Sequence, residues 1–195
     1  MHRDAALPTF RLQPGVSLAQ VQPQAQNAVT LDSPALQVFT DLTQVKAATV
    51  HPSTTLRQAE QTMIYQGVRM LFVVTEMPSL LGLITTTDLG GDRAVRIVQQ
   101  RGLRYDELTV GDVMTSLASL DAVELDALRT ATVRNLIATL KVHGRNHLLV
   151  VEGGGAAALH VRGVISRAQI ERQLGKPIEL VEVAGSFAEL GQMLT

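Results

Sequence analysis

Short apolar runs alternate with helical patterns along the chain, and two of these runs lie close together in its first half. Residues 70–75 form a continuous apolar and β-branched run, and residues 80–84 form another after a polar turn. Runs of this length that are bounded by turn residues are typical of buried strands. The second run is followed by residues 85–88, three threonines and an aspartate, which are residue types that begin helices. We therefore predict two adjacent strands and a helix that opens near Asp88.

A helix is predicted immediately before these strands. Residues 55–58 match the capping-box pattern of a helix start, and Gly67 occupies the place where such a helix would end. Between them, four apolar residues are expected on one face of the helix: Leu56, Ala59, Met63 and Ile64. A further helix is expected over residues 93–100, beyond a break at Gly90-Gly91.

The start of the chain gives weaker signals. Residues 1–33 carry three prolines and alternating glutamines, and we expect partial order there, with the last part packing on the core. The serine and proline at 33–34 are typical of a helix start and predict a short helix over residues 35–42. Residues 47–50 predict a brief strand that the next proline stops.

The order of elements in the first half of the chain occurs a second time. The separation of equivalent positions grows from 75 to 77 to 81 residues along the pairs Val38–Val113, Gly67–Gly144 and Gly82–Gly163. Because insertions accumulate in loops, a separation that grows in small steps is expected of an internal duplication. One copy alone cannot cover both faces of its sheet. We therefore predict an α/β (α+β) fold of two β-α-β-β-α repeats packed together.

Composition narrows the possible functions. The chain has 195 residues, of which 46% are apolar and 3% aromatic, so a packed aliphatic core is available. The net charge is −1 and no basic block occurs, which argues against nucleic acid as the primary ligand. The absence of cysteine excludes disulfides and thiolate chemistry. No apolar run approaches the roughly 20 residues that span a bilayer, and no signal-peptide pattern opens the chain. We expect a cytoplasmic protein that does not bind membranes.

The stretch that begins at Gly82 carries the clearest candidate chemistry. A glycine allows another group to approach the backbone closely, and three hydroxyls and the Asp88 carboxylate follow at the expected helix start. Backbone N–H groups there favour an anion such as phosphate, and a carboxylate can accept hydrogen bonds from a sugar diol. Helix capping alone also explains these residue types. On this stretch alone, a ligand site and a plain helix cap both remain open.

No catalytic arrangement is evident in the sequence. It contains no nucleophile-elbow pattern, no His-Glu-x-x-His and no Walker glycine loop. His143 and His147 are four residues apart, but Gly144 lies between them at an expected helix end, which argues against a metal pair. We therefore predict neither enzymatic activity nor a metal or cofactor site.

The two repeats resemble a tandem pair of cystathionine β-synthase (CBS) domains, the Bateman module, over roughly residues 36–175. The resemblance rests on the order of elements, on the glycine helix ends before apolar strands, and on the motifs Gln37-Val38-Phe39-Thr40, Asp112-Val113-Met114-Thr115 and Gly82-Leu83-Ile84-Thr85-Thr86-Thr87-Asp88. It implies that the repeats pack about a pseudo-twofold axis and leave two clefts. In this family the clefts commonly bind adenosine compounds: AMP, ADP, ATP or S-adenosylmethionine.

The resemblance also assigns site residues. The family pattern Gly-h-x-Thr/Ser-x-x-Asp maps onto the stretch from Gly82 to Asp88, whose aspartate would bind ribose. The segment before the first helix usually lines the adenine pocket, and basic residues at strand entries hold phosphates in some members. For those basic residues a solvated surface charge is the alternative. The predicted ligand-binding residues are Thr49, Val50, Pro52, Arg69, Gly82, Thr85, Thr87, Asp88, His147 and Ser166.

The second copy departs from the family pattern. Its equivalent stretch runs from Gly163 to Gln169, so that Gln169 stands where the ribose carboxylate belongs. An amide lacks the charge-assisted bonding that roughly doubles the strength of a hydrogen bond. We expect one competent site around Asp88 and a weak, altered or empty second site.

These observations predict a regulatory module. It would bind an adenosine nucleotide in the cleft between the repeats, form a homodimer and signal to a separate effector protein. A ligand-free protein-interaction scaffold is the alternative, favoured by the altered second site and the terminal segments. The predicted divisions are an N-terminal extension at 1–33, a first CBS repeat with its following helix at 34–102, a second repeat at 103–175 and a strand–helix extension at 176–195.

Overall fold

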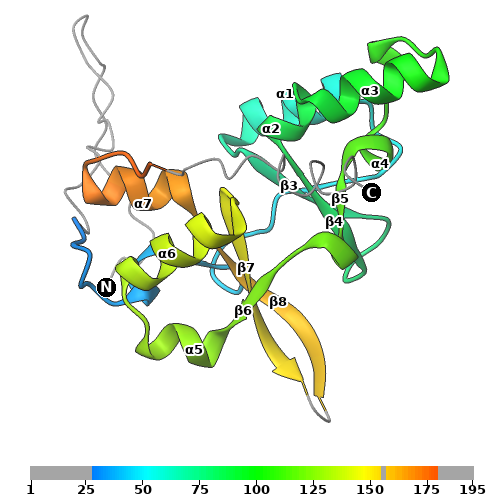
Figure 1. Ribbon diagram of the computed structural model, residues 1–195. Coiled ribbons are helices and arrows are strands. Elements are labelled where there is room, and N and C mark those ends of the chain that lie inside the picture. Colours follow the sequence, from blue (N-terminus) through cyan, green and yellow to red (C-terminus); the bar gives the residue numbers. More distant parts are fainter. Residues whose placement is uncertain (1–27, 155–156, 180–195) are drawn as a thin grey trace, which may run out of the picture.

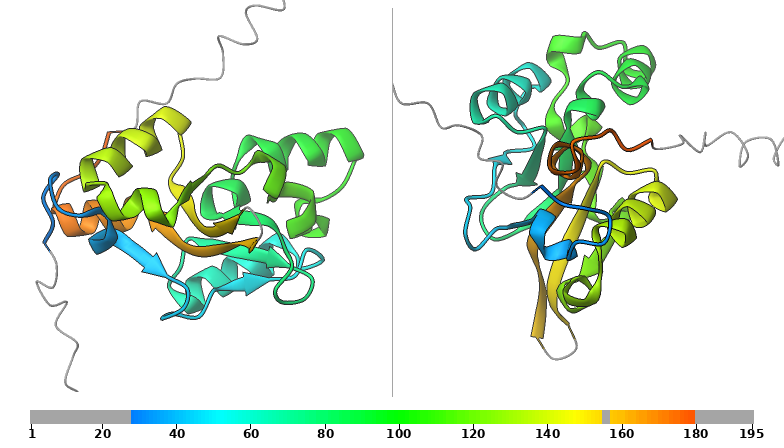
Figure 2. Two further views of the ribbon diagram at one scale, coloured as in Figure 1. Left: turned by 90° about the horizontal axis from the view of Figure 1, so that it is seen from below. Right: turned by 90° about the vertical axis from the view of Figure 1, so that its left-hand side faces the viewer.

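The computed structural model describes residues 28–154 and 157–179, which form two four-stranded sheets with helices packed against them (Figure 1). Residues 1–27 and 180–195 lie outside this part of the chain, and with them most of the predicted strand–helix extension at 176–195. Figure 2 shows the two groups of elements from two further directions. The predicted α+β fold of two repeats is confirmed.

The first sheet has the strand order β2-β3-β4-β5. Its strands are β2 (Thr49–Val50), β3 (Met70–Val74), β4 (Leu80–Thr85) and β5 (Thr115–Ser116). The helices whose apolar residues pack on it are α1 (Leu56–Gln66), α2 (Thr86–Leu89), α3 (Asp92–Arg101) and α4 (Val110–Val113). A short 3₁₀ helix, η2 (Tyr105–Glu107), precedes α4.

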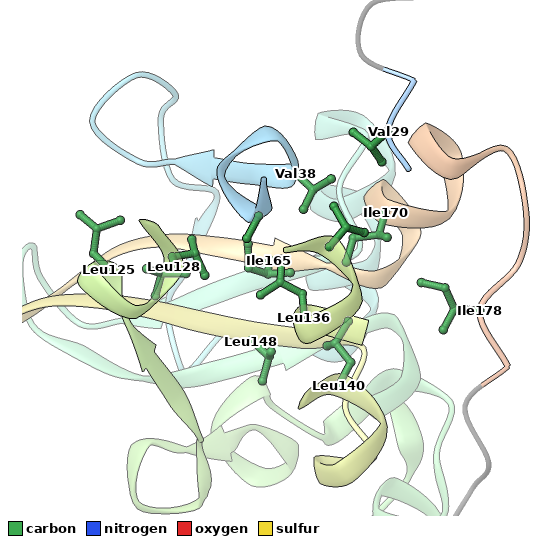
Figure 3. Packing of buried hydrophobic residues seen from close by; sticks show 13 residues of the cluster. Val29, Val38, Leu125, Leu128, Leu136, Leu140, Leu148, Ile165, Ile170 and Ile178 are labelled. Atoms are coloured by element: carbon green, nitrogen blue, oxygen red, sulfur yellow. The ribbon is translucent and has the colours of Figure 1, made fainter. Parts of the chain in front are cut away.

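The second sheet has the strand order β1-β8-β7-β6. Its strands are β1 (Phe39–Asp41), β6 (Ala122–Glu124), β7 (His147–Gly154) and β8 (Ala157–Ser166). The helices beside it are η1 (Ala35–Val38), α5 (Leu125–Thr130), α6 (Val133–His143) and α7 (Arg167–Leu174), with η3 (Leu117–Ser119) between β5 and β6. Figure 3 shows the core that these helices share with the sheet, in which Leu148 and Ile165 from the strands meet Leu136 and Leu140 from α6.

Alternation along the strands explains why the two sheets face each other. In β3, Leu71 and Val73 contribute to the core beneath the helices, whereas Met70 and Phe72 belong to a separate apolar cluster. Leu149 and Val164 of the second sheet join that same cluster. Successive strand residues point to opposite faces, so each sheet uses one face for its own helices and the other for its neighbour.

The two repeats have matching strand registers. Met70 lies opposite Thr85 in the first hairpin, and His147 lies opposite Ser166 in the second. The hairpins of both repeats are also irregular at equivalent positions, after Val73 and after Val150. The repeat that the sequence predicts is therefore present in the backbone pairing itself.

Each repeat lends an edge strand to the sheet of the other. β1 lies near the start of the first repeat but pairs with β8, and β5 lies near the start of the second repeat but pairs with β4. Thr40 lies opposite Val164 and Thr115 lies opposite Leu83, so the two exchanged strands occupy equivalent places. The exchange fastens the repeats together by backbone hydrogen bonds as well as by apolar contact.

The repeated glycines Gly82 and Gly163 allow this close pairing. A Cβ atom on Gly82 would collide with the carbonyl oxygen of Thr115, and one on Gly163 would collide with the carbonyl oxygen of Thr40 and the ring of Phe39. Any larger residue would push the exchanged strand away. The glycine that opens the candidate motif is thus explained by strand packing.

Several helices begin and end at the residues that the sequence predicts. Thr55 and Gln58 form the predicted capping box at the start of α1. Gly67 ends α1 and Gly144 ends α6, both in the left-handed conformation, with φ of 65° and 58°. The predicted break at Gly90-Gly91 separates α2 from α3.

Several local predictions need correction. The helix expected over 35–42 is only the 3₁₀ turn η1, because residues 39–41 pair with β8 instead. The helix expected to open near Asp88 begins at Thr86. Ile64 is 74% exposed, since it lies roughly 100° around the helix from Met63 and beyond the buried face. The strand expected over 47–50 is confined to β2.

The described ends of the chain pack on the second sheet. Val29 is buried, and its N–H donates to the carbonyl of Gln173 at 3.1 Å. Ile178 is buried in the same core (Figure 3). The last part of the predicted N-terminal extension therefore packs on the core as expected. Across the described ranges, no helix is long and apolar enough to cross a membrane.

Candidate functional site

Three adjoining cavities lie where the two hairpins meet, and His147 lines all of them. The Asp88 cavity, of about 150 Å³, also includes Thr85 and Thr87 in its wall. The central cavity, of about 250 Å³, shares those two threonines and adds Arg69 and Ser166. The Gln169 cavity, of about 370 Å³, shares Arg69, His147 and Ser166 with the central cavity.

Asp88 is held by the residue that precedes its helix. The N–H and the hydroxyl of Thr85 both donate to Oδ2 of Asp88, each at 2.7 Å. The Asp88 N–H donates back to the Thr85 hydroxyl at 3.4 Å, which completes a capping box. Within the described part of the chain, Oδ1 of Asp88 accepts no hydrogen bond. One carboxylate oxygen therefore caps the helix while the other remains available to a ligand.

The second repeat completes the wall of the Asp88 cavity. Thr115 and Leu120 come from β5 and the segment after it, and Arg145 and Asn146 come from the turn before β7. Because β5 pairs antiparallel with β4, Thr115 lies opposite Leu83, on the strand that leads to Asp88. Sequence reasoning missed these four residues. The repeat equivalence of Thr115 with Thr40 was the one signal that could have pointed to this strand.

The equivalent position in the second repeat is arranged differently. Gln169 does not cap α7, and Ser166 makes no side-chain capping bond there. Instead the Gln169 Oε1 accepts a hydrogen bond from the hydroxyl of Thr40 at 2.9 Å. The substitution of amide for carboxylate therefore changes the connections of the side chain as well as its charge.

Comparison with known proteins identifies the fold. Residues 39–89 match the sequence model of the CBS domain. This chain carries a CBS domain. A comparison with curated proteins finds no match.

Solved structures extend the likeness to both repeats. An uncharacterized conserved protein from Pyrococcus horikoshii is 21% identical, with 77% of this chain and 98% of that chain covered and a TM-score of 0.55. The structure of CBSX2 in complex with AMP is 21% identical, with 72% and 94% covered and a TM-score of 0.51. A CBS-domain containing protein from Agrobacterium tumefaciens is 20% identical, with 67% and 93% covered and a TM-score of 0.50. At these identities the likeness concerns the fold, which is that of a CBS-domain protein.

His147 is partly buried between the two repeats, where it lines all three cavities. Burial lowers the pKa of His147 from 6.5 to about 4, while the charge of Asp88 raises it and that of Arg69 lowers it. The imidazole is therefore neutral near neutral pH. As a neutral ring, it offers a ligand one N–H donor and one acceptor and no positive charge.

Cations lie on both sides of the central cavity. Arg69 follows α1 and reaches the cavity from the first repeat. Arg167 reaches it from α7 of the second repeat, where its Nε donates to Glu171 at 2.8 Å and its Nη1 to Asn146 at 3.3 Å. Arg69 is thus the more available of the two for an added anion, because Arg167 already has an anionic partner.

The residues that were expected to line the adenine pocket beside Asp88 do not lie on the wall of its cavity. Val50 is buried in the core of the first sheet. The carbonyl of Pro52 accepts a hydrogen bond from the N–H of Gly111 at 2.8 Å, within the structure around α4. Thr49 lines a separate apolar cavity of about 620 Å³ together with Phe72. The structure therefore brings together Thr85, Thr87, Asp88 and His147, with Arg69 and Ser166 adjoining.

The helix start at Asp88 offers less to an anion than the sequence suggests. α2 has four residues and ends at Gly90, so its backbone dipoles add up over a single turn. In the described ranges there is also no group of three or more residues that could hold a metal ion. The distinguishing group of the site is the Asp88 carboxylate itself.

Proposed function

We propose that this protein is a regulatory ligand-sensing module that binds an adenosine-containing nucleotide between its CBS repeats. AMP, ADP, ATP and S-adenosylmethionine are the candidate ligands. Oδ1 of Asp88 carries the proposal, because a carboxylate oxygen without a protein partner, on the wall of a cavity, can accept hydrogen bonds from a ribose diol. CBSX2, which shares the fold, was solved in complex with AMP.

The connected cavities support a ligand with separate sugar and phosphate parts. The Asp88 and central cavities share four lining residues: Thr85, Thr87, Asn146 and His147. Together their volumes fall near the lower end of the roughly 300–1,000 Å³ usual for small-molecule sites. A ribose at Asp88 would direct its phosphates towards the side chain of Arg69.

Signalling would follow because residues of both repeats form the wall of the Asp88 cavity. A ligand in the Asp88 cavity contacts the first repeat through Asp88 and the second through Arg145 and Asn146. Such a ligand stabilises whichever arrangement of the repeats it binds more tightly, and only that difference in affinity can shift the equilibrium. We propose that the shift is transmitted to a separate effector protein by a cytoplasmic homodimer that catalyses no reaction.

A thermal-shift screen tests the proposal. The purified protein is heated with AMP, ADP, ATP, S-adenosylmethionine or GMP, the last as a base control. A ligand at 100 times its Kd stabilises the fold by about 2.7 kcal/mol, which raises Tm by several degrees in a chain of this size. We expect such a rise with at least one adenosine compound and none with GMP. An unchanged Tm with every adenosine compound would contradict the proposal.

A ligand-free interaction scaffold is the second candidate. Asp112 forms the same capping box with Thr109 as Asp88 forms with Thr85, with the hydroxyl donating at 2.7 Å in both. Asp88 could therefore be required for the helix cap alone. This candidate predicts that no nucleotide changes Tm.

A further inference from the structure

The apolar cavity of about 620 Å³ lies at the turn ends of the two hairpins, and we call it the hairpin cavity. Val74 at the end of β3 lines it, whereas Met70 at the start of β3 lies opposite Thr85 of the candidate nucleotide site. Met70 and Val74 are four residues apart, or about 13 Å along a strand. Among the described residues, no polar side chain of the other three cavities lines this one.

The hairpin cavity runs from the apolar cluster between the sheets to the surface. Phe72 and Leu149 line it and are buried in that cluster. Met77 and Leu159 also line it, and they are 68% and 61% exposed. Its volume lies within the roughly 300–1,000 Å³ usual for small-molecule sites. A ligand could therefore enter from solvent and contact both repeats.

The wall of the hairpin cavity suits an uncharged molecule. Thr49 and His160 are the polar residues in the described wall, which contains no aspartate, glutamate, lysine or arginine. A charged group that leaves water without a partner loses a large hydration free energy, whereas an apolar group gains by the transfer. The chemistry of the wall therefore selects against ions and in favour of apolar surface.

The second hairpin closes one side of the cavity with a segment that is longer than in the first hairpin. β7 and β8 have 8 and 10 residues, where β3 and β4 have 5 and 6. Among the described strands, β6 pairs with β7 as far as Val151, and β1 pairs with β8 as far as Gly163. Figure 1 shows the hairpin projecting beyond both. The projecting part brings Ala158 and Leu159 to the cavity.

We propose that the hairpin cavity is a second binding site, which takes a flat or aliphatic small molecule without a charged group. Apolar surface drives this binding, at about 25 cal/mol for each Å² removed from water. The ligand lies between the two hairpins and contacts Phe72 and Leu149 at its inner end. The inference does not rest on the proposed function, because Asp88 takes no part in this site.

Fluorescence titration of the full chain with N-phenyl-1-naphthylamine tests the inference. This dye is uncharged, and its emission rises in apolar surroundings. We expect one equivalent to bind, and changing both Met77→Ser and Leu159→Ser to weaken binding by about tenfold or more because apolar contact is lost. 1-Decanol should displace the dye at a concentration at least tenfold lower than decanoate does, since the carboxylate finds no partner.

The matched control changes two exposed apolar residues outside the described cavities, Ile64→Ser and Val142→Ser, which are 74% and 80% exposed in the wild type. This control and Asp88→Asn should both bind the dye as wild type does. The inference is overturned if wild type shows no saturable binding, or if the two pairs of serine substitutions weaken binding equally. It is also overturned if the Met77 and Leu159 pair converts a dimer to a monomer in light scattering, because a second copy of the chain then covers the cavity. Failure of the proposed function differs from these results, since it leaves binding of the dye intact.

Discussion

Asp41 of β1 and Arg162 of β8 form a two-pronged ion pair. The Nε of Arg162 lies 3.0 Å from one carboxylate oxygen of Asp41, and Nη2 lies 2.7 Å from the other. Arg162 also donates to Glu152 at 3.1 Å. The pair fixes the exchanged strand of the first repeat to the sheet of the second repeat. The ion pair therefore stabilises the pairing of β1 with β8, which joins the two repeats.

This pair predicts an acid-dependent loss of stability. The hydrogen bonds from Arg162, and then those from Thr43, lower the pKa of Asp41 from 3.8 to about 2. Its contribution is complete above pH about 4 and is lost as pH falls towards 2, because the unfolded chain takes up the proton first. Asp41→Asn should lower Tm by a few degrees at pH 7. The difference from wild type should shrink between pH 4 and 2, and a constant difference would contradict the assignment.

Gly82→Ala should destabilise the fold. The added Cβ collides with the Thr115 carbonyl oxygen and must displace β5, at a cost of about 1–3 kcal/mol as in other overpacked sites. Gly90→Ala is the matched control, since a Cβ there meets nothing within 4 Å, and it should be neutral or slightly stabilising. Urea denaturation measures both. Equal midpoints for the two variants would show that β5 does not need the glycine.

The lowered pKa of His147 predicts a second dependence of stability on pH, at higher pH than that of Asp41. Its pKa is about 4 in the folded protein and 6.5 as the ordinary value. Between these values the unfolded chain binds more protons, so the free energy of unfolding decreases as the pH is lowered from 6.5 to 4, by up to about 3 kcal/mol. His147→Met, which places the residue found at the equivalent Met70, should remove this dependence.

The control for that measurement is the exposed His160, changed to Gln. Denaturation curves between pH 7.5 and pH 4.5 should keep the wild-type slope in this variant and lose part of it in His147→Met. The same slope in His147→Met and wild type would mean that His147 titrates normally.

Much of the fold was predictable because local patterns determined it. The apolar runs at 70–74 and 147–151, the capping box at Thr55 and the left-handed glycines are short-range signals, and the structure agrees with each. The duplication made the second repeat predictable from the first. Ile64 was misplaced because it lies at the margin of an amphipathic face, where spacing alone does not decide burial.

The wall of the candidate site was not predictable, because it depends on the exchange of edge strands. β1 and β5 have three and two residues, too few for a periodic pattern, and their partners lie far away in the sequence. Asp88 could therefore be recognised from its own motif, whereas Arg145 and Asn146 beside it could not. The family resemblance nominated Thr49, Val50 and Pro52 for the adenine pocket, and these three residues do not line the Asp88 cavity.

The central claim is that the charge of Asp88 binds a ligand, and Asp88→Asn tests it most directly. Asparagine can keep the helix cap, as Asn135 does in this chain by accepting from the Thr132 N–H at 2.9 Å and hydroxyl at 2.8 Å. Asp112→Asn is the control, since Asp112 caps its helix in the same way as Asp88 but lies outside the three cavities.

The measurement is calorimetric titration of wild type and both variants with the adenosine compound that raises Tm most. We expect Asp88→Asn to weaken binding at the ribose-dependent site at least tenfold with little change in Tm of the free protein, and Asp112→Asn to bind as wild type does. Wild-type affinity in Asp88→Asn would contradict the account and leave Asp88 as a helix cap alone.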